Sequence, residues 1–381
     1  MSEHRAIFTD DQKLFRETVR RFFETEVIPH QEAWEEAGMV PREIWNRCGE
    51  LGFLLPRAPE EYGGLGLTDF RYEAILIEET ARANESGLAL SLHNSVVGPY
   101  ILNYGSEEQK KRLVPGLVSG ERVLAIAMTE PDAGSDLAGM KATAVEKDDH
   151  WVLNGSKTFI TNGLHSDTVI VCAKTDPANP RTIGLFLVHR GNPGFERGRH
   201  LKKIGLHSQD TAELFFRDVK VPRHDVLGDP SQGFYYLMNK LAVERLVVCV
   251  GAVSGAEAAL ADTVRYVKER QVFGKPLSSF QNTRFRLAEL QTKVKIGRTY
   301  VDRLIMDEQE DRLDPADCCG AKYWTTELAC EVADECLQLY GGYGYMSEYP
   351  ISRRFVNSRV GKIYAGSNEI MKLVVSRSMG L

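Results

Sequence analysis

The 381-residue sequence has no long hydrophobic run, no excess of basic side chains and no paired cysteine motif. Its longest apolar run, residues 246–253, is far shorter than the about 20 residues that cross a bilayer, so we expect no membrane span. The formal net charge of −6 argues against nucleic acid as the main partner, because phosphate binding requires a basic face. The composition, with 26% charged residues, is typical of a soluble globular protein.

Patterns that bind metals or form disulfides are also lacking. The nine histidines are dispersed and no His-Glu-x-x-His sequence occurs, so we expect no metal site. The seven cysteines include the adjacent pair Cys318-Cys319 but no Cys-x-x-Cys, which indicates reduced, mostly buried thiols. The first residues, with Asp10 and Asp11, are typical neither of a secretory signal nor of a transit peptide, and we expect a cytoplasmic protein.

The first segment of the chain, residues 1–121, has a helical pattern. Phe15, Val19 and Phe22 recur at three- and four-residue steps among charged residues, which predicts amphipathic helices. The glycine-rich run 60–67 follows no strand, so we interpret it as a surface loop and not as a phosphate-binding motif.

The second segment, residues 122–233, has short runs typical of β-strands. Asn154-Gly155 lies between two such runs and predicts a hairpin turn at that point. Further runs at 168–173, 183–188 and 214–216 predict additional strands. Since no long helices alternate with them, the sheet should be antiparallel and not the doubly wound sheet of a Rossmann domain.

The third segment, residues 234–381, is helical again. Three long helices are predicted at about 242–266, 281–307 and 315–339, and Gly341-Gly342 suits a helix stop. The predicted fold class is therefore α+β, with an N-terminal helical domain, a middle antiparallel β-domain and a C-terminal helical bundle. The 43% apolar content is sufficient for substantial cores in such domains.

A first candidate ligand motif is Ala-Met-Thr-Glu-Pro-Asp-Ala-Gly-Ser-Asp, residues 127–136. It is a strand end followed by a turn, in which Pro131 and Gly134 interrupt strand pairing and leave backbone amides free. Free amides and the Thr129 hydroxyl suit the carbonyl-rich edge of a flavin. A simple capped turn would have the same local pattern.

A second motif, Phe159-Ile160-Thr161-Asn162-Gly163, is expected at the end of a strand. Phe159 and Thr161 are two residues apart and would lie on one face, where the ring could cover a flavin and the hydroxyl could meet a ring nitrogen. The alternative is an ordinary core aromatic beside an exposed threonine.

A third motif lies in the C-terminal segment. Arg270 begins Arg-Gln-Val-Phe-Gly-Lys-Pro, and its guanidinium is suited to bidentate binding of a pyrophosphate. A solvated arginine and, for Gly341-Gly342, a bare helix stop are the alternatives.

These motifs, together with Lys-Ile-Tyr-Ala-Gly-Ser-Asn-Glu-Ile at 362–370, resemble those of the acyl-CoA dehydrogenases. The resemblance covers nearly the whole chain and is closest to the long-chain and isovaleryl-CoA dehydrogenase branches. It implies the fold described above, an FAD cofactor, an acyl-CoA substrate, a homotetramer and an electron-transferring flavoprotein as electron acceptor. The implied reaction is the α,β-dehydrogenation of a saturated acyl-CoA to the trans-2-enoyl-CoA.

The resemblance also implies which residues bind FAD. Thr129 matches a hydroxyl at the flavin pyrimidine ring, and Thr161 matches a donor to flavin N5; many relatives have Trp in place of Phe159. In relatives, the counterparts of Arg270 and of the Gly-Gly pair serve the FAD of a neighbouring subunit. The full implied set is Ile126, Met128, Thr129, Ser135, Phe159, Ile160, Thr161, Arg270, Phe273, Gln281, Gln338, Gly341, Gly342, Ser367, Asn368 and Glu369.

The catalytic base does not occupy the position in the 362–370 motif where most relatives carry it. Most relatives carry a glutamate between the Tyr and the Gly of the last motif, where this chain has Ala365. The long-chain and isovaleryl branches pair a small residue there with a glutamate on a helix, and Glu244 matches that glutamate. Glu244 is therefore the implied base, whereas Glu369 is implied to bind the cofactor. From the local sequence alone, Glu244 could equally form a surface ion pair with Lys240, four residues earlier.

The implied acyl-CoA site surrounds this base. The Ala365 backbone N–H is expected to donate to the thioester carbonyl, and residues 93–100 to form the floor of the acyl pocket. Gly98 and Pro99 would relax a helix there and admit a long or branched chain. The implied substrate-binding residues are Ser135, Tyr235, Ala242, Val243, Arg245, Tyr364, Ala365 and Gly366.

Two other functions fit the same sequence. An acyl-CoA oxidase would return electrons to oxygen, although the chain is short for the typical oxidase, which carries extra C-terminal sequence. A non-catalytic flavin- or acyl-CoA-binding protein would have no activity for a Glu244→Gln substitution to remove.

Overall fold

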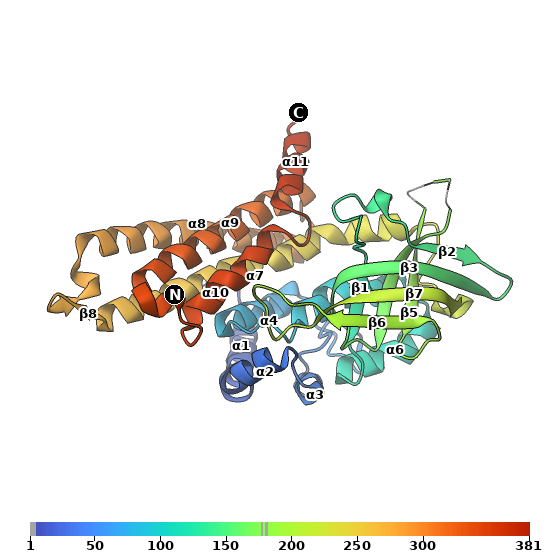
Figure 1. Ribbon diagram of the computed structural model, residues 1–381, viewed down its shortest axis with the longest axis horizontal. Coiled ribbons are helices and arrows are strands. Elements are labelled where there is room, and N and C mark those ends of the chain that lie inside the picture. The colour runs from blue at the N-terminus through green and yellow to red at the C-terminus, as the bar shows by residue number, and fades with distance from the viewer. Residues whose placement is uncertain (1–4, 177, 180–181) are drawn as a thin grey trace.

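The computed structural model describes residues 5–176, 178–179 and 182–381. Helices form both ends of the chain, and a β-sheet lies between them in sequence (Figure 1). The sheet occupies one end of an elongated molecule, and the C-terminal helices extend away from it toward the small β8 strand at the opposite end. The predicted fold class is confirmed. The domain boundaries at 121/122 and 233/234 stay predictions.

The N-terminal region is helical, as predicted. The Thr9 hydroxyl accepts from the Gln12 amide and the Gln12 side chain accepts from the Thr9 amide, a capping box that begins the first helix. Ser106 and Gln109 begin the last helix of this region in the same way. The helices are α1 (Asp10–Phe22), α2 (Gln31–Ala37), α3 (Arg42–Glu50), α4 (Phe70–Ala83), α5 (Gly98–Tyr104) and α6 (Glu107–Ser119).

A widened helical turn precedes α5. The segment Leu92–Val97 is a π-helix, and α5 begins at Gly98-Pro99. Proline has no amide hydrogen and its ring displaces the carbonyl four residues earlier, so a regular α-helix cannot continue through it. This agrees with the helix relaxation expected at Gly98 and Pro99.

The middle region is a seven-stranded sheet in the order β1-β4-β2-β3-β7-β6, with β5 paired to β4. Most pairings are antiparallel, as predicted, but β4 pairs with β1 and β2 in parallel. The difference arises because the β2–β3 hairpin separates β1 from β4 in the chain, so β4 returns in the direction of β1. The strands are β1 (Leu124–Ala127), β2 (Thr143–Glu146), β3 (His150–Thr161), β4 (Thr168–Lys174), β5 (Ile183–His189), β6 (Phe195–His200) and β7 (Thr211–Pro222).

The hairpin predicted at Asn154-Gly155 is wrong, because these residues lie inside the continuous strand β3. The turn of the β2–β3 hairpin lies earlier, where the Lys147 amide donates to the His150 carbonyl. Asn154-Gly155 instead marks a shift of register against β7, where the Asn154 amide group and Asp218 hydrogen bond each other. A turn dipeptide within a strand therefore indicated a bulge.

The C-terminal region consists of long helices, as predicted. The first helix is longer than its predicted apolar core at 242–266, because it begins at residue 233 and ends at residue 269. The elements are α7 (Gly233–Glu269), β8 (Gln271–Val272), β9 (Lys275–Pro276), α8 (Gln281–Gln309), α9 (Pro315–Tyr340), α10 (Pro350–Ser358) and α11 (Asn368–Ser378).

Helix α7 is the core helix of this bundle. Among the described residues it is the one helix long and apolar enough to cross a membrane, a length that the apolar run 246–253 did not indicate. Its apolar side packs on α4, α8 and α9, and Leu246, Val250 and Val253 are buried there. Half of the apolar window of α7 is buried by these contacts within the protein.

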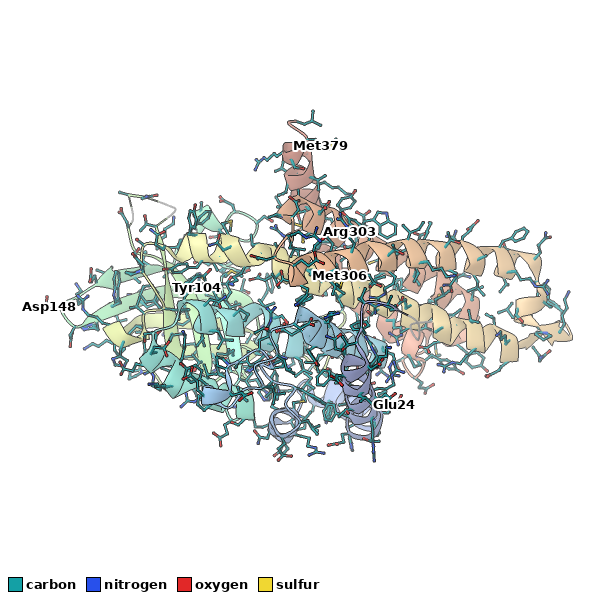
Figure 2. All side chains as sticks on the ribbon, turned by 180° about the vertical axis from the view of Figure 1, so that it is seen from behind. Glu24, Tyr104, Asp148, Arg303, Met306 and Met379 are labelled. Atoms are coloured by element: carbon teal, nitrogen blue, oxygen red, sulfur yellow. The ribbon has the colours of Figure 1, made fainter. Side chains whose placement is uncertain are left out.

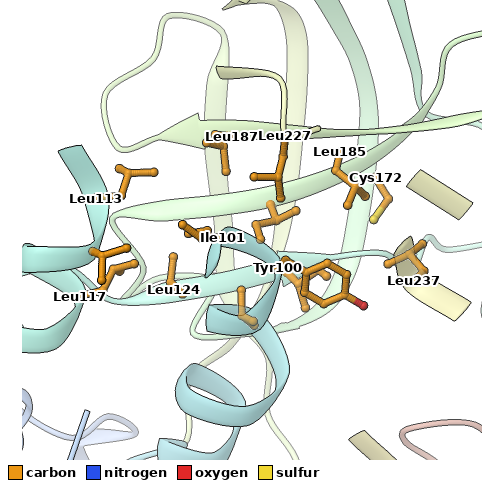
Figure 3. Close-up of a cluster of buried hydrophobic side chains, with 14 of the residues drawn as sticks. Tyr100, Ile101, Leu113, Leu117, Leu124, Cys172, Leu185, Leu187, Leu227 and Leu237 are labelled. Atoms are coloured by element: carbon orange, nitrogen blue, oxygen red, sulfur yellow. The ribbon is translucent and has the colours of Figure 1, made fainter. Parts of the chain in front are cut away.

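One buried cluster joins the sheet to the helices on both sides (Figure 3). It contains Tyr100 and Ile101 of α5, Leu185 of β5 and Leu237 of α7. Because α5 packs on the sheet and on the start of α7 at once, the cluster fixes the beginning of α7 relative to the sheet.

Candidate active site

Glu244 is a buried carboxyl group on α7 with 6% of its surface exposed. The Tyr100 hydroxyl donates to its Oε1 atom at 3.0 Å. Burial raises the pKa of Glu244 to about 7, and the opposing effects of the Tyr100 hydrogen bond, Arg245 and Lys240 are smaller. A carboxyl group with this pKa can both accept and release a proton near neutral pH.

The alternative of a surface ion pair between Glu244 and Lys240 is wrong. No ion pair joins these two side chains in the described part of the chain, and the Lys240 ammonium lies 5.7 Å from the centre of the Tyr104 ring instead. The burial of Glu244 therefore has no compensating salt bridge from that lysine.

Arg245, the next residue, is also buried, and its Nε atom has no hydrogen-bond partner in the described residues. Its guanidinium lies close enough to Cys319 and Lys322 of α9 to influence their pKa values. The predicted substrate-binding residues Ala242 and Val243 are half-buried on the same turn of α7, and Tyr235 is exposed two turns earlier.

The predicted active-site loop connects a short 3-10 helix at Arg359–Lys362 to α11. Ala365 has φ +53° and Gly366 has φ +87°, so two successive residues are left-handed. Such a conformation is strained for a residue with a side chain, and strained residues cluster at ligand sites. Tyr364 beside them is half-exposed.

The remaining loop residues have different environments. Ser367 is the N-cap of α11, and Glu369 is exposed in its first turn. Hydrogen bonds from its own amide and from the Ser367 hydroxyl lower the pKa of Glu369, which makes it a poor base near neutral pH. Asn368 is buried, and its side-chain amide is engaged within the protein by Tyr323 and Thr326. Their cofactor roles stay predictions.

The first two predicted flavin motifs lie side by side. The Thr158 amide donates to the Thr129 carbonyl at 2.9 Å, which joins the end of β3 to the turn after β1. Met128 and Thr129 are half-buried and Ser135 is exposed, whereas Ile126 is buried beneath them.

A buried ion pair fixes this junction. Lys157 Nζ donates to Glu130 Oε1 at 2.8 Å and to the Met128 carbonyl at 3.0 Å. Glu130 also accepts from the amide of Ala142. The pair therefore connects Lys157 of β3 with Met128 and Glu130 of the turn and with Ala142 before β2. Sequence reasoning missed Lys157 and Glu130; the available signal was a lysine at an inward-facing position of a strand.

The aromatic ring of the second motif is displayed by a bulge. The register between β3 and β7 shifts between Lys157 and Ile160, and Phe159 has φ +58° with 68% of its surface exposed. The burial still alternates from Phe159 onward, because Phe159 is exposed, Ile160 is buried and Thr161 is half-buried. Phe159 and Thr161 therefore lie on the side opposite Ile160, as predicted. Ile160 points into the sheet core, so only its backbone is available to a ligand.

The third motif lies at the far end of the bundle, beyond the end of α7. A cavity of about 680 Å³ is lined there by Arg270, Gln338, Gly341, Gly342 and neighbouring residues. The Arg270 guanidinium is exposed and lies 5.3 Å from the centre of the Tyr343 ring, and a side chain at Gly341 or Gly342 would meet no atom within 4 Å. Phe273 at the β8–β9 turn has φ +49° and is 95% exposed.

The two sets of predicted cofactor residues are far apart in one chain. Arg270 is 26 residues beyond Glu244 along α7, which corresponds to about 39 Å at 1.5 Å per residue. Figure 1 places β8 and the sheet at opposite ends of the molecule. A single cofactor bound to one chain cannot contact both sets.

Comparison with known protein families gives matches in all three regions of the chain. Residues 9–121, 125–219 and 231–380 match the N-terminal, middle and C-terminal domains of acyl-CoA dehydrogenase. The chain belongs to the acyl-CoA dehydrogenase family.

Two curated relatives and one solved structure illustrate the similarity. The mitochondrial long-chain specific acyl-CoA dehydrogenase of Sus scrofa is 48% identical over 98% of this chain and 88% of its own length. The mitochondrial isovaleryl-CoA dehydrogenase of Oryza sativa is 36% identical over 98% of this chain and 92% of its own. The crystal structure of an acyl-CoA dehydrogenase from Geobacillus kaustophilus matches with a TM-score of 0.97 and 48% identity, and the match covers 99% of this chain and 100% of that one.

Proposed function

We propose that this acyl-CoA dehydrogenase oxidises a long-chain or branched saturated acyl-CoA to the trans-2-enoyl-CoA, with Glu244 as the catalytic base. The observation that carries the assignment of the base is the burial of Glu244 on α7, with a pKa of about 7, in a chain whose loop has Ala365. A base whose pKa lies near neutral pH is suited to removing the weakly acidic proton on the carbon beside a thioester carbonyl.

The loop supplies the complementary interaction. Proton removal leaves negative charge on the thioester oxygen, and a backbone N–H aimed at that oxygen stabilises it. The left-handed pair Ala365-Gly366 carries no side chain larger than a methyl group, so its own side chains do not shield the Ala365 N–H. We assign the Ala365 N–H to this role.

Members of the family use FAD, which when bound supplies the acceptor for the hydride from the β-carbon. The residues at both cofactor sets fit such a group. The Thr129 and Phe159 region offers a hydroxyl and an exposed ring on a turn fixed by Lys157, and the distant cavity offers a guanidinium beside glycines that leave space for phosphates.

The distance between the two sets supports an oligomer in which each cofactor contacts two chains. We propose a homotetramer, as the resemblance implies, with Arg270 of one protomer completing the cofactor site of its partner. We further propose that an electron-transferring flavoprotein accepts the electrons and that the protein acts in the cytoplasm.

The preference for a long or branched acyl chain is supported by the two relatives and by the widened turn before α5. The π-helical segment Leu92–Val97 is followed directly by Gly98, the second residue before Tyr100, so the widened turn lies next to the residue that contacts Glu244. Initial rates with straight acyl-CoAs of increasing length and with branched short ones, measured with one flavoprotein acceptor, test this part. A strict preference for short unbranched chains would contradict it.

Replacing the base tests the catalytic assignment. Glu244→Gln keeps the shape of the side chain and removes its basicity, and we expect the rate of flavin reduction by substrate to fall at least about 10³-fold with FAD still bound. Glu17→Gln is the control and should retain full activity, because Glu17 is exposed on α1 and belongs to none of the predicted sites. An active Glu244→Gln protein would contradict the assignment, and rapid reoxidation of the reduced wild type by air would favour an oxidase.

A further inference from the structure

Lys322 is a buried cation that the chemistry described above leaves unexplained. It is the only basic residue in α9, its side chain is fully buried, and it forms no ion pair with a carboxylate in the described part of the chain. An ammonium group without a counter-ion is costly to bury unless other hydrogen bonds replace its water.

Its hydrogen bonds lead to the active-site loop. Lys322 Nζ donates to the Gly366 carbonyl at 2.7 Å and to Asn368 Oδ1 at 3.1 Å. Gly366 lies in the loop between the 3-10 helix Arg359–Lys362 and α11, and Asn368 is the first residue of α11. The ammonium therefore fixes the loop to α9 from the protein interior.

The loop requires such an anchor because of its backbone conformation. Ala365 is left-handed although it has a side chain, and isolated residues in this region hold that conformation only when the surroundings enforce it. The anchored Gly366 carbonyl lies directly after Ala365. The Ala365 N–H and the Gly366 carbonyl are joined only through the φ and ψ angles of these two residues. Holding the carbonyl therefore restricts the left-handed pair and, through it, the direction of the Ala365 N–H.

Neighbouring polar contacts strengthen the same connection. The Thr326 hydroxyl, one turn further along α9, shares hydrogen bonds with the Asn368 side chain at 3.1 and 3.3 Å. Asn368 also donates to the Tyr323 carbonyl at 3.3 Å. Polar groups at three positions of α9, the Lys322 ammonium, the Tyr323 carbonyl and the Thr326 hydroxyl, therefore hold the end of the loop and the start of α11.

The charge of Lys322 is retained near neutral pH. Burial lowers its pKa to about 8, and Arg245 acts in the same direction, but the group remains mainly protonated at pH 7. The second buried cation, Arg245, lies near enough to Lys322 to contribute to this lowering.

We propose that Lys322 is a positioning residue, which orients the Ala365 N–H toward the thioester carbonyl oxygen by holding the Gly366 carbonyl. The inference rests on the proposed function, because it assigns a role within that reaction. It adds a residue on α9 to a site otherwise formed by α7 and the loop.

A bound 3-oxoacyl-CoA provides the test. Its α-proton is acidic, its enolate absorbs ultraviolet light, and a donor at the carbonyl oxygen lowers its apparent pKa on the enzyme. Lys322→Met should raise this ligand pKa by at least one unit and lower kcat at least tenfold with a smaller change in KM. Lys322→Gln, which can still donate to both acceptors, should recover part of each effect.

Two further variants keep the result interpretable. Thr325→Val removes a buried α9 hydroxyl whose partners are the Ala321 carbonyl, the Lys322 carbonyl and the Cys249 thiol of α7. None of these partners belongs to the loop or to α11, so the substitution should leave the ligand pKa unchanged. Thr326→Val breaks a link to Asn368 and should raise the ligand pKa by a smaller amount, even if Lys322→Met does not fold. A wild type that is active, with a ligand pKa that neither Lys322→Gln nor Thr326→Val changes, would overturn the positioning role. A flavin-loaded wild type that no acyl-CoA reduces would overturn the proposed function itself.

Discussion

At the scale of single residues, Glu244 is subject to two opposed influences. Removal from water favours the neutral acid, whereas the Tyr100 hydroxyl, with Arg245 and Lys240, favours the carboxylate. Burial is the larger influence, so the pKa of Glu244 is raised to about 7. The Tyr100 hydrogen bond adjusts this value and holds the carboxyl oxygen at a defined place.

Replacing Tyr100 by Phe should therefore raise the pKa of Glu244 further. A hydrogen bond to a charged group contributes about 1.5–3 kcal/mol, and about 1.4 kcal/mol corresponds to one pKa unit. The ascending limb of the pH profile of kcat/KM should move to higher pH by about one unit, so that activity at pH 6 falls more than at pH 9. Tyr104→Phe, on the same helix without a contact to Glu244, is the control, and an equal shift in that variant would contradict the assignment.

Glu244 also predicts how stability depends on pH. Its pKa in the folded protein, about 7, lies above the ordinary value of 4.5, so the folded state binds the extra proton between these values. Its contribution to stability is complete below about pH 4.5 and is lost as the pH rises through 7. Glu244→Gln should therefore melt increasingly higher than the wild type between pH 5 and pH 8. A constant difference in Tm over that range would show that Glu244 does not titrate as described.

At the scale of elements, the active-site loop combines strain with close packing. Gly366 has φ +87°, and a methyl group there would approach the end of the Met371 side chain to 2.6 Å. The loop is thereby packed against α11 as well as anchored to α9 through Lys322.

Gly366→Ala should lower the free energy of unfolding by about 1–2 kcal/mol, the cost of a side chain in the left-handed region, and should reduce kcat because the loop shifts. Gly63→Ala is a matched control, since Gly63 has φ +88° with open space around it in the surface loop 60–67. Chemical denaturation and steady-state rates separate the two effects. If both variants lose equal stability and neither loses activity, the Met371 contact has no functional consequence.

The long helices were predictable from the sequence, whereas several site residues were not. Periodic apolar residues over 25 or more positions identify α7, α8 and α9 whatever they pack against. Asn154-Gly155 misled because a turn dipeptide is equally compatible with a bulge, and the distinction depends on the partner strand β7.

The roles of Lys157 and Lys322, and the contact of Tyr100 with Glu244, were missed for a related reason. Each of these residues lies within an ordinary helix or strand, and its role depends on a contact with Glu244, Met128 or Gly366 that is distant in sequence. Glu244 itself was predicted only because Ala365 stands where most relatives have the catalytic glutamate, and because two branches of the family combine a small residue there with a glutamate on this helix. A polar residue on a regular element carries little signal until its tertiary contacts are known.

At the scale of the whole molecule, the bundle separates two functions along its length. α7 begins at the sheet, carries Glu244 near that end and leads to Arg270 at the other. Helix α11 stands clear of the bundle, with Met379 near its tip (Figure 2). The Arg270 end of the bundle is the one proposed to contribute to the cofactor site of a partner chain.

Arg270→Ala should reduce the FAD content of the purified protein, because a pyrophosphate would lose a bidentate partner. Since Arg270 is exposed, the fold of the protomer should be retained. Lys268→Ala, an exposed cation two residues away on the last turn of α7, is the control for general loss of positive charge. Flavin absorbance per protein chain measures the effect, and an unchanged ratio in the Arg270 variant would contradict a cofactor role.

The length of α7 has a thermodynamic consequence. If each flavin contacts the sheet end of one chain and the Arg270 end of another, then cofactor binding and subunit assembly are a single linked equilibrium. Dilution should then release flavin, and added flavin should drive apoprotein subunits together even without substrate. The retention of the cofactor would depend on how concentrated the enzyme is, a property that no single chain possesses.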